Sequence, residues 1–258
     1  MNLLLTALVF ISSLSAEAFF ERQISGVVSN RPSGLALTAG LAYNYKVWDD
    51  SQTTFWKYGY IRPKIGYDTS FLVNTGMAEL QVYPISILGF TAGSSYSYRS
   101  IKKNEEYNCD QVSCQSELHR NYFRTNLNLG AGKFISSLSY QIEHYTISHD
   151  DLWPSVDFGT LLLIPHENGQ QEKMTAFLGY KASDTLDVGV LEMFNQVTDQ
   201  STDIKTKSEG QYVVARLKEG DFKYMAGLGT FGTDYNEKSF AAIFKVIWVI
   251  DPSLSLAE

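Results

Sequence analysis

Six cations share one kind of position in this sequence. Each stands between two residues of a mostly apolar row, as Arg62 does between Ile61 and Pro63; the six are Arg62, Lys64, Arg124, Arg216, Lys223 and Lys245. In an extended strand neighbouring side chains point to opposite faces, so these cations lie on the face away from the apolar row. Rings of Arg and Lys around a water-filled passage favour anions.

Carboxylates occupy the same polar rows in smaller number. They are Asp68, Glu79, Glu143 and Asp187. Lys46 and Lys173 lie on the same rows and add two cations to the six above. The polar rows are therefore predicted to be positive, although the whole chain has a formal net charge of −7 at pH 7. Most of the acid falls in the segments between the alternating runs. An acidic exported chain is a poor candidate for binding nucleic acid.

The element that would position these charges is clearest at residues 33–48, SGLALTAGLAYNYKVW. One row of this run is apolar and ends in Tyr43 and Tyr45, and the other is small or polar. Such strict alternation predicts a strand with one apolar face. A tilted strand of about 9–11 residues crosses a bilayer, with tyrosines at the interfaces. The mean hydropathy of −0.14 suits a membrane β-barrel, because only every second strand residue meets lipid.

The connections between the predicted strands alternate in length. Short ones fall at residues 84–86, 133, 182–185 and 218–221, and long ones at 99–120, 148–172, 196–209 and 230–238. Short periplasmic turns and long extracellular loops are typical of outer-membrane barrels. Eleven strands can be assigned, and a bacterial barrel closes with an even number. We therefore predict an all-β, antiparallel barrel of 12 strands, with 10 as the alternative. The twelfth strand is sought at residues 23–30, or else at 161–164.

The N-terminus predicts export. Residues 3–14 are almost wholly apolar, and small residues at Ala16 and Ala18 mark a cleavage site after Ala18. No later apolar run reaches the 18 residues that a transmembrane helix needs. The predicted organisation is a signal peptide at 1–18, an N-terminal segment at 19–32 as a candidate first strand, a barrel at 33–250 and a C-terminal tail at 251–258.

Cys109 and Cys114 lie in one polar segment, YNCDQVSCQSE. Export implies an oxidising compartment, so we predict a disulfide, which stabilises a loop this short by about 2 kcal/mol on the chain-entropy model. A metal site is disfavoured because His119 supplies at most a third ligand. The sequence contains no dinucleotide or phosphate-binding glycine motif. No metal and no cofactor are therefore expected.

The chain resembles bacterial outer-membrane β-barrel proteins as a class. The resemblance rests on the signal peptide, the alternating strands with terminal Tyr and Trp, and the short turns on one side with long loops on the other. The resemblance is porin-like and points to no subfamily. It implies a place in the bacterial outer membrane, in contact with the bilayer and its lipids. Such proteins usually end on an aromatic residue; here Phe244, Val246 and Trp248 are in place, but residues 251–258 follow them.

Two classes of function remain open from the sequence. One is a barrel that is either a narrow, anion-favouring pore for small anionic solutes or closed by charge pairing and side-chain filling, as many small barrels are. The other is a structural or adhesive barrel whose loops bind an extracellular partner. A remote third is an acyl hydrolase, because His144 and Thr146 repeat the H-x-S spacing of some outer-membrane hydrolases with Thr in place of Ser. We expect no enzyme, since no orienting acid is identifiable.

Overall fold

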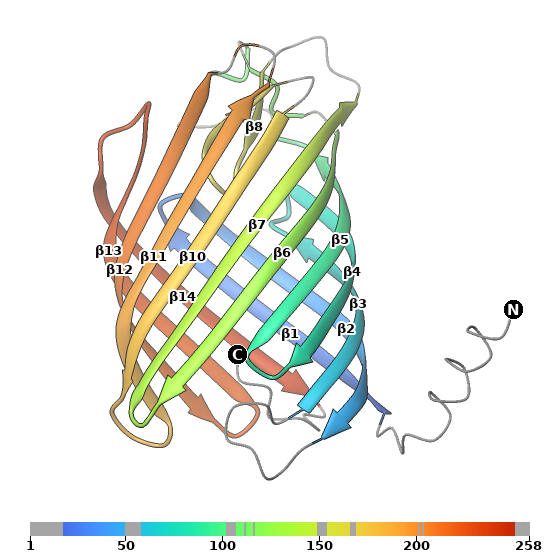
Figure 1. The fold of residues 1–258 in the computed structure, drawn as a ribbon. Helices are drawn as coiled ribbons and strands as arrows, with labels where there is room; N and C mark the ends of the chain where they lie inside the picture. The colour runs from blue at the N-terminus through green and yellow to red at the C-terminus, as the bar shows by residue number, and fades with distance from the viewer. Residues whose placement is uncertain are drawn as a thin grey trace, which may run out of the picture.

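The computed structural model describes residues 18–49, 58–101, 107–110, 112–115, 117–148, 154–165, 169–200, 202 and 204–250. Residues 1–17 of the predicted signal peptide at 1–18 and the predicted tail at 251–258 lie outside this part of the chain, whereas Ala18 is described and begins the first strand. Twelve of the described strands close into one antiparallel barrel (Figure 1). They are β1 (Ala18–Asn30), β2 (Ser33–Asp49), β3 (Tyr58–Thr69), β4 (Val73–Ile85), β5 (Leu88–Arg99), β6 (Glu117–Ala131), β7 (Phe134–Ser148), β10 (Gly169–Lys181), β11 (Leu186–Asp199), β12 (Lys205–Glu219), β13 (Phe222–Thr233) and β14 (Ser239–Ile250).

The prediction of twelve strands is confirmed, and so is the first candidate for the twelfth. Residues 23–30 belong to β1, which pairs with β2 on one side and closes the barrel against β14 on the other. The second candidate, residues 161–164, does not join the barrel. It contributes β9 (Leu162–Ile164), which pairs only with β8 (Ser155–Asp157) in a small separate hairpin. Among the described residues, no helix has the length and apolar character to cross a membrane.

The barrel strands have one apolar and one polar face. Outward side chains such as Ile65 and Leu178 are 59% and 64% exposed, whereas the inward Arg62 is 3% exposed. Leaving so many large apolar side chains exposed in water would be unfavourable, but a bilayer covers such a belt. The alternation is therefore explained by lipid outside the barrel and a polar interior.

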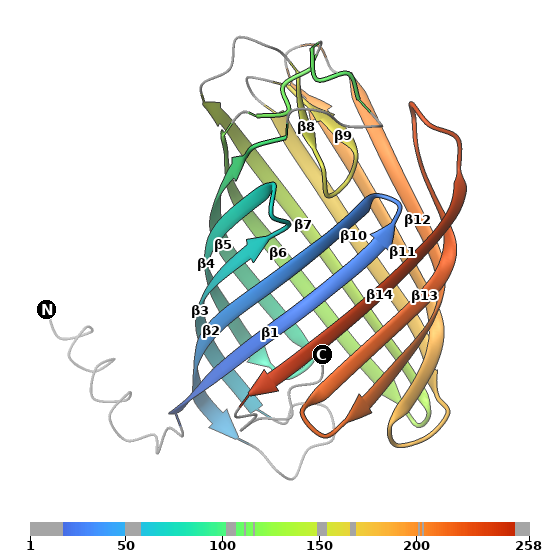
Figure 2. The same ribbon diagram turned by 180° about the vertical axis from the view of Figure 1, so that it is seen from behind.

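From β4 onward the two ends of the barrel differ as the sequence predicted, whereas the β1–β2 connection at the end of the long loops is only two residues, Arg31 and Pro32. Two-residue turns join β4 to β5, β6 to β7 and β12 to β13 at the end that we call the turn end. Gly132 and Gly220 have φ of 61° and 58° there, a backbone conformation that glycine adopts readily. At the opposite end, the loop end, long connections join β5 to β6 and β7 to β10 (Figure 2).

Several strands extend further toward the loop end than the alternation predicted. Residues 196–209 were predicted to be a loop, but β11 continues to Asp199 and β12 begins at Lys205. The outward row here is polar, and Gln211 donates a hydrogen bond to Glu192. The backbone hydrogen bonds between β11 and β12 continue beyond the last apolar outward residue. A strand prediction that relies on alternating apolar residues therefore ends the strand too early.

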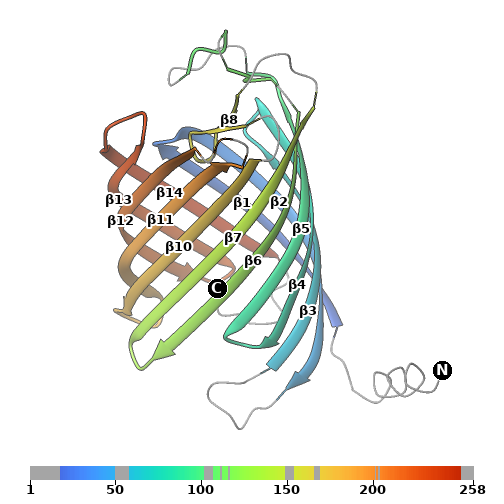
Figure 3. The same cartoon turned by 45° about the horizontal axis from the view of Figure 1, so that its top comes forward.

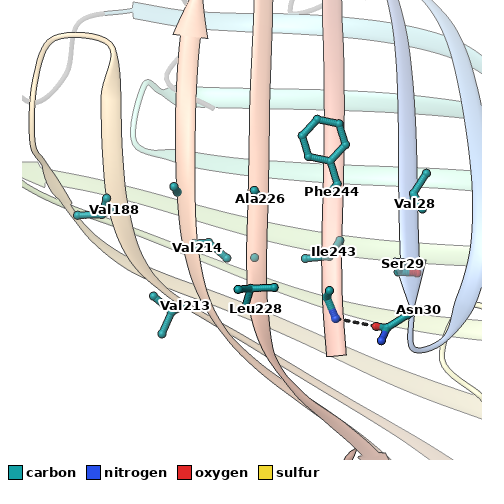
Figure 4. A pocket seen from close by; sticks show the side chains of 13 residues that line it. Val28, Ser29, Asn30, Val188, Val213, Val214, Ala226, Leu228, Ile243 and Phe244 are labelled. Atoms are coloured by element: carbon teal, nitrogen blue, oxygen red, sulfur yellow. Dashed lines mark hydrogen bonds between the residues drawn. The ribbon is translucent and has the colours of Figure 1, made fainter. Parts of the chain in front are cut away.

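The seam between β1 and β14 is completed by a side chain. Their ladder ends at Ser29 and Ile243, and beyond it Asn30 accepts a hydrogen bond of 2.6 Å from the Ala242 amide. Outside the seam lies an apolar groove of about 680 Å³ between β1 and β11–β14 (Figure 4). Asn30 thus satisfies a strand edge that would otherwise face lipid with an unpaired donor.

Candidate functional site: the barrel interior and its hairpin

One part of the interior wall is a continuous hydrogen-bonded chain. Arg62 on β3 forms an ion pair with Glu21 on β1 and donates a hydrogen bond to Gln81 on β4. Gln81 donates to Glu79 over 2.8 Å, and Glu79 accepts from Arg124 on β6 at 3.0 Å. Two of the predicted interior cations are therefore bound to carboxylates of the same wall.

The other predicted residues also lie on inward rows. Arg216 pairs with Asp187 at 3.0 Å, and its guanidinium lies 4.0 Å from the centre of the Phe177 ring. Glu143 forms an ion pair of 2.9 Å with Lys173. Four further predicted residues are inward and half-buried: Lys64, Asp68, Lys223 and Lys245. The interior thus combines paired charges with half-exposed cations.

The β8–β9 hairpin lies inside the barrel at the loop end. Figure 3, with the loop end turned forward, shows β8 within the ring of strands. Val156, Leu162 and Ile164 have no exposed surface. Ile164 packs in one buried cluster with Leu118, Tyr145 and Ile147 of the wall, and Leu161 packs in another with residues of β10–β14. The hairpin is therefore a docked element that narrows this end.

Polar contacts also fix the hairpin to the wall. Arg99 on β5 donates hydrogen bonds to the Val156 carbonyl and, at 2.6 Å, to the Ser155 hydroxyl. Gln171 on β10 donates to the Thr160 hydroxyl over 3.0 Å. These donors come from β5 and β10, which are separated in the ring by β6 and β7, so the hairpin is held at more than one point of the wall.

Asp157 is the charged residue of the hairpin. Its oxygens lie 3.8 Å from Nη2 of Arg120 and 3.7 Å from Nζ of Lys173. Burial opposes ionisation of this carboxyl, but Lys173 and Arg120, with the Gly159 amide and the Thr160 hydroxyl, lower its pKa below the ordinary value of 3.8. Asp157 is therefore an anion held among wall cations.

The disulfide predicted between Cys109 and Cys114 is present. Its segment rests on the hairpin: the Ser113 amide donates to the Pro154 carbonyl over 2.8 Å, and the Val156 amide donates to the Ser113 carbonyl over 3.2 Å. The disulfide therefore constrains the backbone that covers β8.

The two halves of the interior differ in how fully they are filled. Near the loop end, wall residues such as Ser97, Gln171 and Val197 are buried at 2% exposure or less. Further toward the turn end, Arg124 and Arg216 keep 28–29% of their side-chain surface exposed. The interior is thus sealed most tightly around the hairpin and keeps accessible cations beyond it.

Sequence reasoning missed five charged residues of this interior, among them Asp199, a buried inward residue in the part of β11 that was predicted to be a loop. Glu21 lies in a segment whose alternation is weak, and Asp157 was assigned to an irregular loop. Arg99 and Arg120 were placed at the limits of a loop, but both are inward residues of strands. A signal was available for the two arginines. Each falls at the position where the inward row of its strand would continue if the alternation were extended by a few residues.

The histidine singled out by its spacing is on the outer face. His144 and Thr146 are both exposed there. A different pair is hydrogen-bonded: Ser94 Oγ lies 3.0 Å from His119 Nε2, also on the outward row. Within the described part of the chain, Ser94 is the hydrogen-bond partner of His119, so this pair has no orienting acid. Among those same residues, no group of His, Cys, Asp and Glu side chains is arranged to hold a metal ion.

Comparison with known protein sequences assigns no family to this chain. No family model matches the sequence, and no curated protein matches it significantly. The fold is that of a closed membrane β-barrel. Similar solved structures include the KdgM porin (TM-score 0.47, 9% identity, 88% of this chain and 98% of that one) and an outer membrane channel from Pseudomonas putida F1 (TM-score 0.48, 12% identity, 91% and 95%). OmpT of Vibrio cholerae is another (TM-score 0.45, 10% identity, 92% and 99%). At these values the similarity assigns no substrate or activity to this chain.

Proposed function

We propose that the protein is an outer-membrane pore for small anionic solutes, narrowed at its loop end by the β8–β9 hairpin. The observation that carries the proposal is the contrast within the interior. The hairpin narrows the loop end through a limited set of contacts, while cations such as Lys64 and Lys245 on the inward rows remain half-exposed. A surplus of positive charge in a water-filled lumen enriches anions and repels cations.

Ion selectivity in planar bilayers tests this proposal. The purified barrel should conduct, and the reversal potential in a KCl gradient should report preference for chloride. Replacing Lys64 and Lys245 together by Gln should lower that preference, because both positive charges leave the interior. Lys205→Gln is the matched control, since Lys205 is exposed on the outward row of β12.

The alternative is a closed barrel that acts through its loops. If no conductance is measured for a barrel that is demonstrably folded, the pore proposal is wrong. The loop end, with the Cys109–Cys114 segment, would then be the surface to test for an extracellular partner. A folded barrel is recognised by the different migration of boiled and unboiled samples on a gel, and membrane fractionation tests its location.

A further inference from the structure

The contacts of Asp157 differ from the other ion pairs of the interior. Lys173–Glu143, Arg124–Glu79 and Arg216–Asp187 close to 2.9–3.0 Å, the range of charge-assisted hydrogen bonds. Asp157 approaches Arg120 and Lys173 only to 3.8 and 3.7 Å. Its hydrogen bonds come from its own hairpin, from the Gly159 amide at 3.2 Å and the Thr160 hydroxyl at 3.0 Å. Asp157 is thus attracted by the wall cations without being hydrogen-bonded to them.

The two cations are positioned by the wall itself. Lys173 is held by Glu143, and the Arg120 guanidinium lies 5.8 Å from the centre of the Tyr145 ring. The Nε donor of Arg120 is buried and has no hydrogen-bond partner among the described residues. The cation pair therefore does not depend on Asp157 for its arrangement, and it retains unused donor capacity.

Access to this pair does not require the hairpin to leave first. The side chains of Arg120 and Lys173 are 19% and 24% exposed, whereas that of Asp157 is 3% exposed. A solute inside the lumen can thus reach both cations while Asp157 is still docked. Competition between the solute and Asp157 follows from this geometry.

We propose that Arg120 and Lys173 form a binding site for a small monocarboxylate, that Asp157 occupies it as a tethered substitute, and that the solute releases the hairpin by displacing Asp157. This inference rests on the proposed function, because the solute must enter the lumen. The carboxylate class follows from the group that now fills the site. The single charge follows from Glu143, which neutralises one of the two cations at 2.9 Å and leaves one positive charge for the ligand.

Thiol labelling of the hairpin tests the proposal without relying on conductance. Val156→Cys places a single reactive thiol at a position with no exposed surface, because Cys109 and Cys114 are bridged. The folded variant is treated with a water-soluble maleimide in sodium chloride or in sodium gluconate at equal ionic strength. Gluconate should raise the labelling rate at least fivefold. If Val156→Cys does not fold, Leu162→Cys on β9, another position with no exposed surface, carries the thiol instead.

Two further variants identify the site. Asp157→Asn, in the same background, should label rapidly in both salts, because the hairpin has lost its charged contact. Arg120→Gln should also label rapidly and should show no response to gluconate. Equal rates in chloride and gluconate for Val156→Cys with Asp157, Arg120 and Lys173 all present would overturn the proposal, as would an undiminished gluconate response in Arg120→Gln. A barrel that conducts anions but labels independently of gluconate would retain the proposed function and remove only this inference.

Discussion

Arg62 on β3 forms an ion pair with Glu21 on β1 across the intervening strand β2, and their side chains are 4% and 8% exposed. The pair links the first strand of the chain to the third, next to the seam where the barrel closes. A buried charge that loses its partner is strongly destabilising, whereas replacing a whole pair by apolar groups is often nearly neutral. The Glu21–Arg62 pair should therefore show strong coupling.

The first prediction concerns this coupling. Arg62→Met leaves Glu21 buried without its cation and should lower the free energy of unfolding by about 3–5 kcal/mol. The double variant Glu21→Leu, Arg62→Met should recover most of that loss, because no charge remains. Urea unfolding of the barrel in lipid vesicles measures both. Additive losses in the double variant would show that the pair is not coupled.

The second prediction tests which residues face lipid. Leu138 is 41% exposed on the outward row of β7, and its neighbour Ser139 lies on the inward row. Leu138→Arg should destabilise the barrel in vesicles by about 2–4 kcal/mol if it lies near the bilayer midplane. Ser139→Arg is the matched control, and it should cost much less because its charge enters the polar interior. If Ser139→Arg destabilised the barrel more than Leu138→Arg, the lipid would lie on the face of Ser139.

The alternation of residues predicted the barrel because lipid and lumen make opposite demands on neighbouring positions. Ile61 and Arg62 illustrate this. The apolar Ile61 faces lipid and the charged Arg62 faces the interior, so the alternation of apolar and polar residues was enough to assign both faces correctly. The partners of the charges could not be predicted in this way. Glu21 meets Arg62 only because the registers of the β1–β2 and β2–β3 ladders bring their inward rows together across β2, and Asp157 meets Lys173 only because a loop folds inward. Both contacts depend on tertiary geometry that local patterns do not encode.

The third prediction concerns the disulfide. Replacing Cys109 and Cys114 by Ala removes a constraint worth about 2 kcal/mol on the chain-entropy model. Because Ser113 is hydrogen-bonded to both Pro154 and Val156, the hairpin should detach more often. The maleimide labelling rate of Val156→Cys should therefore rise severalfold. The urea midpoint of the barrel is the control and should change little, since the segment lies outside the barrel ladder. An unchanged labelling rate would mean that the disulfide does not restrain the hairpin.

The last prediction concerns pH. The pKa of Asp157 is lowered when the hairpin is docked, so its contribution to docking is fully present above the ordinary value of 3.8. That contribution is lost only as the pH falls through the lowered pKa of the docked state. The charged and titratable groups that face Asp157 are Arg120 on β6, Glu143 and Tyr145 on β7, and Lys173 on β10.

Labelling of Val156→Cys should therefore be the same at pH 7 and pH 5, once each rate is divided by that of the urea-unfolded protein at the same pH. This normalisation removes the effect of pH on the thiol itself. Asp157→Asn should be fast at both values, which shows that the assay can detect release. Faster normalised labelling at pH 5 with Asp157 present would mean that protonation in this range weakens docking, contrary to a carboxyl whose pKa is lowered by Lys173 and Arg120.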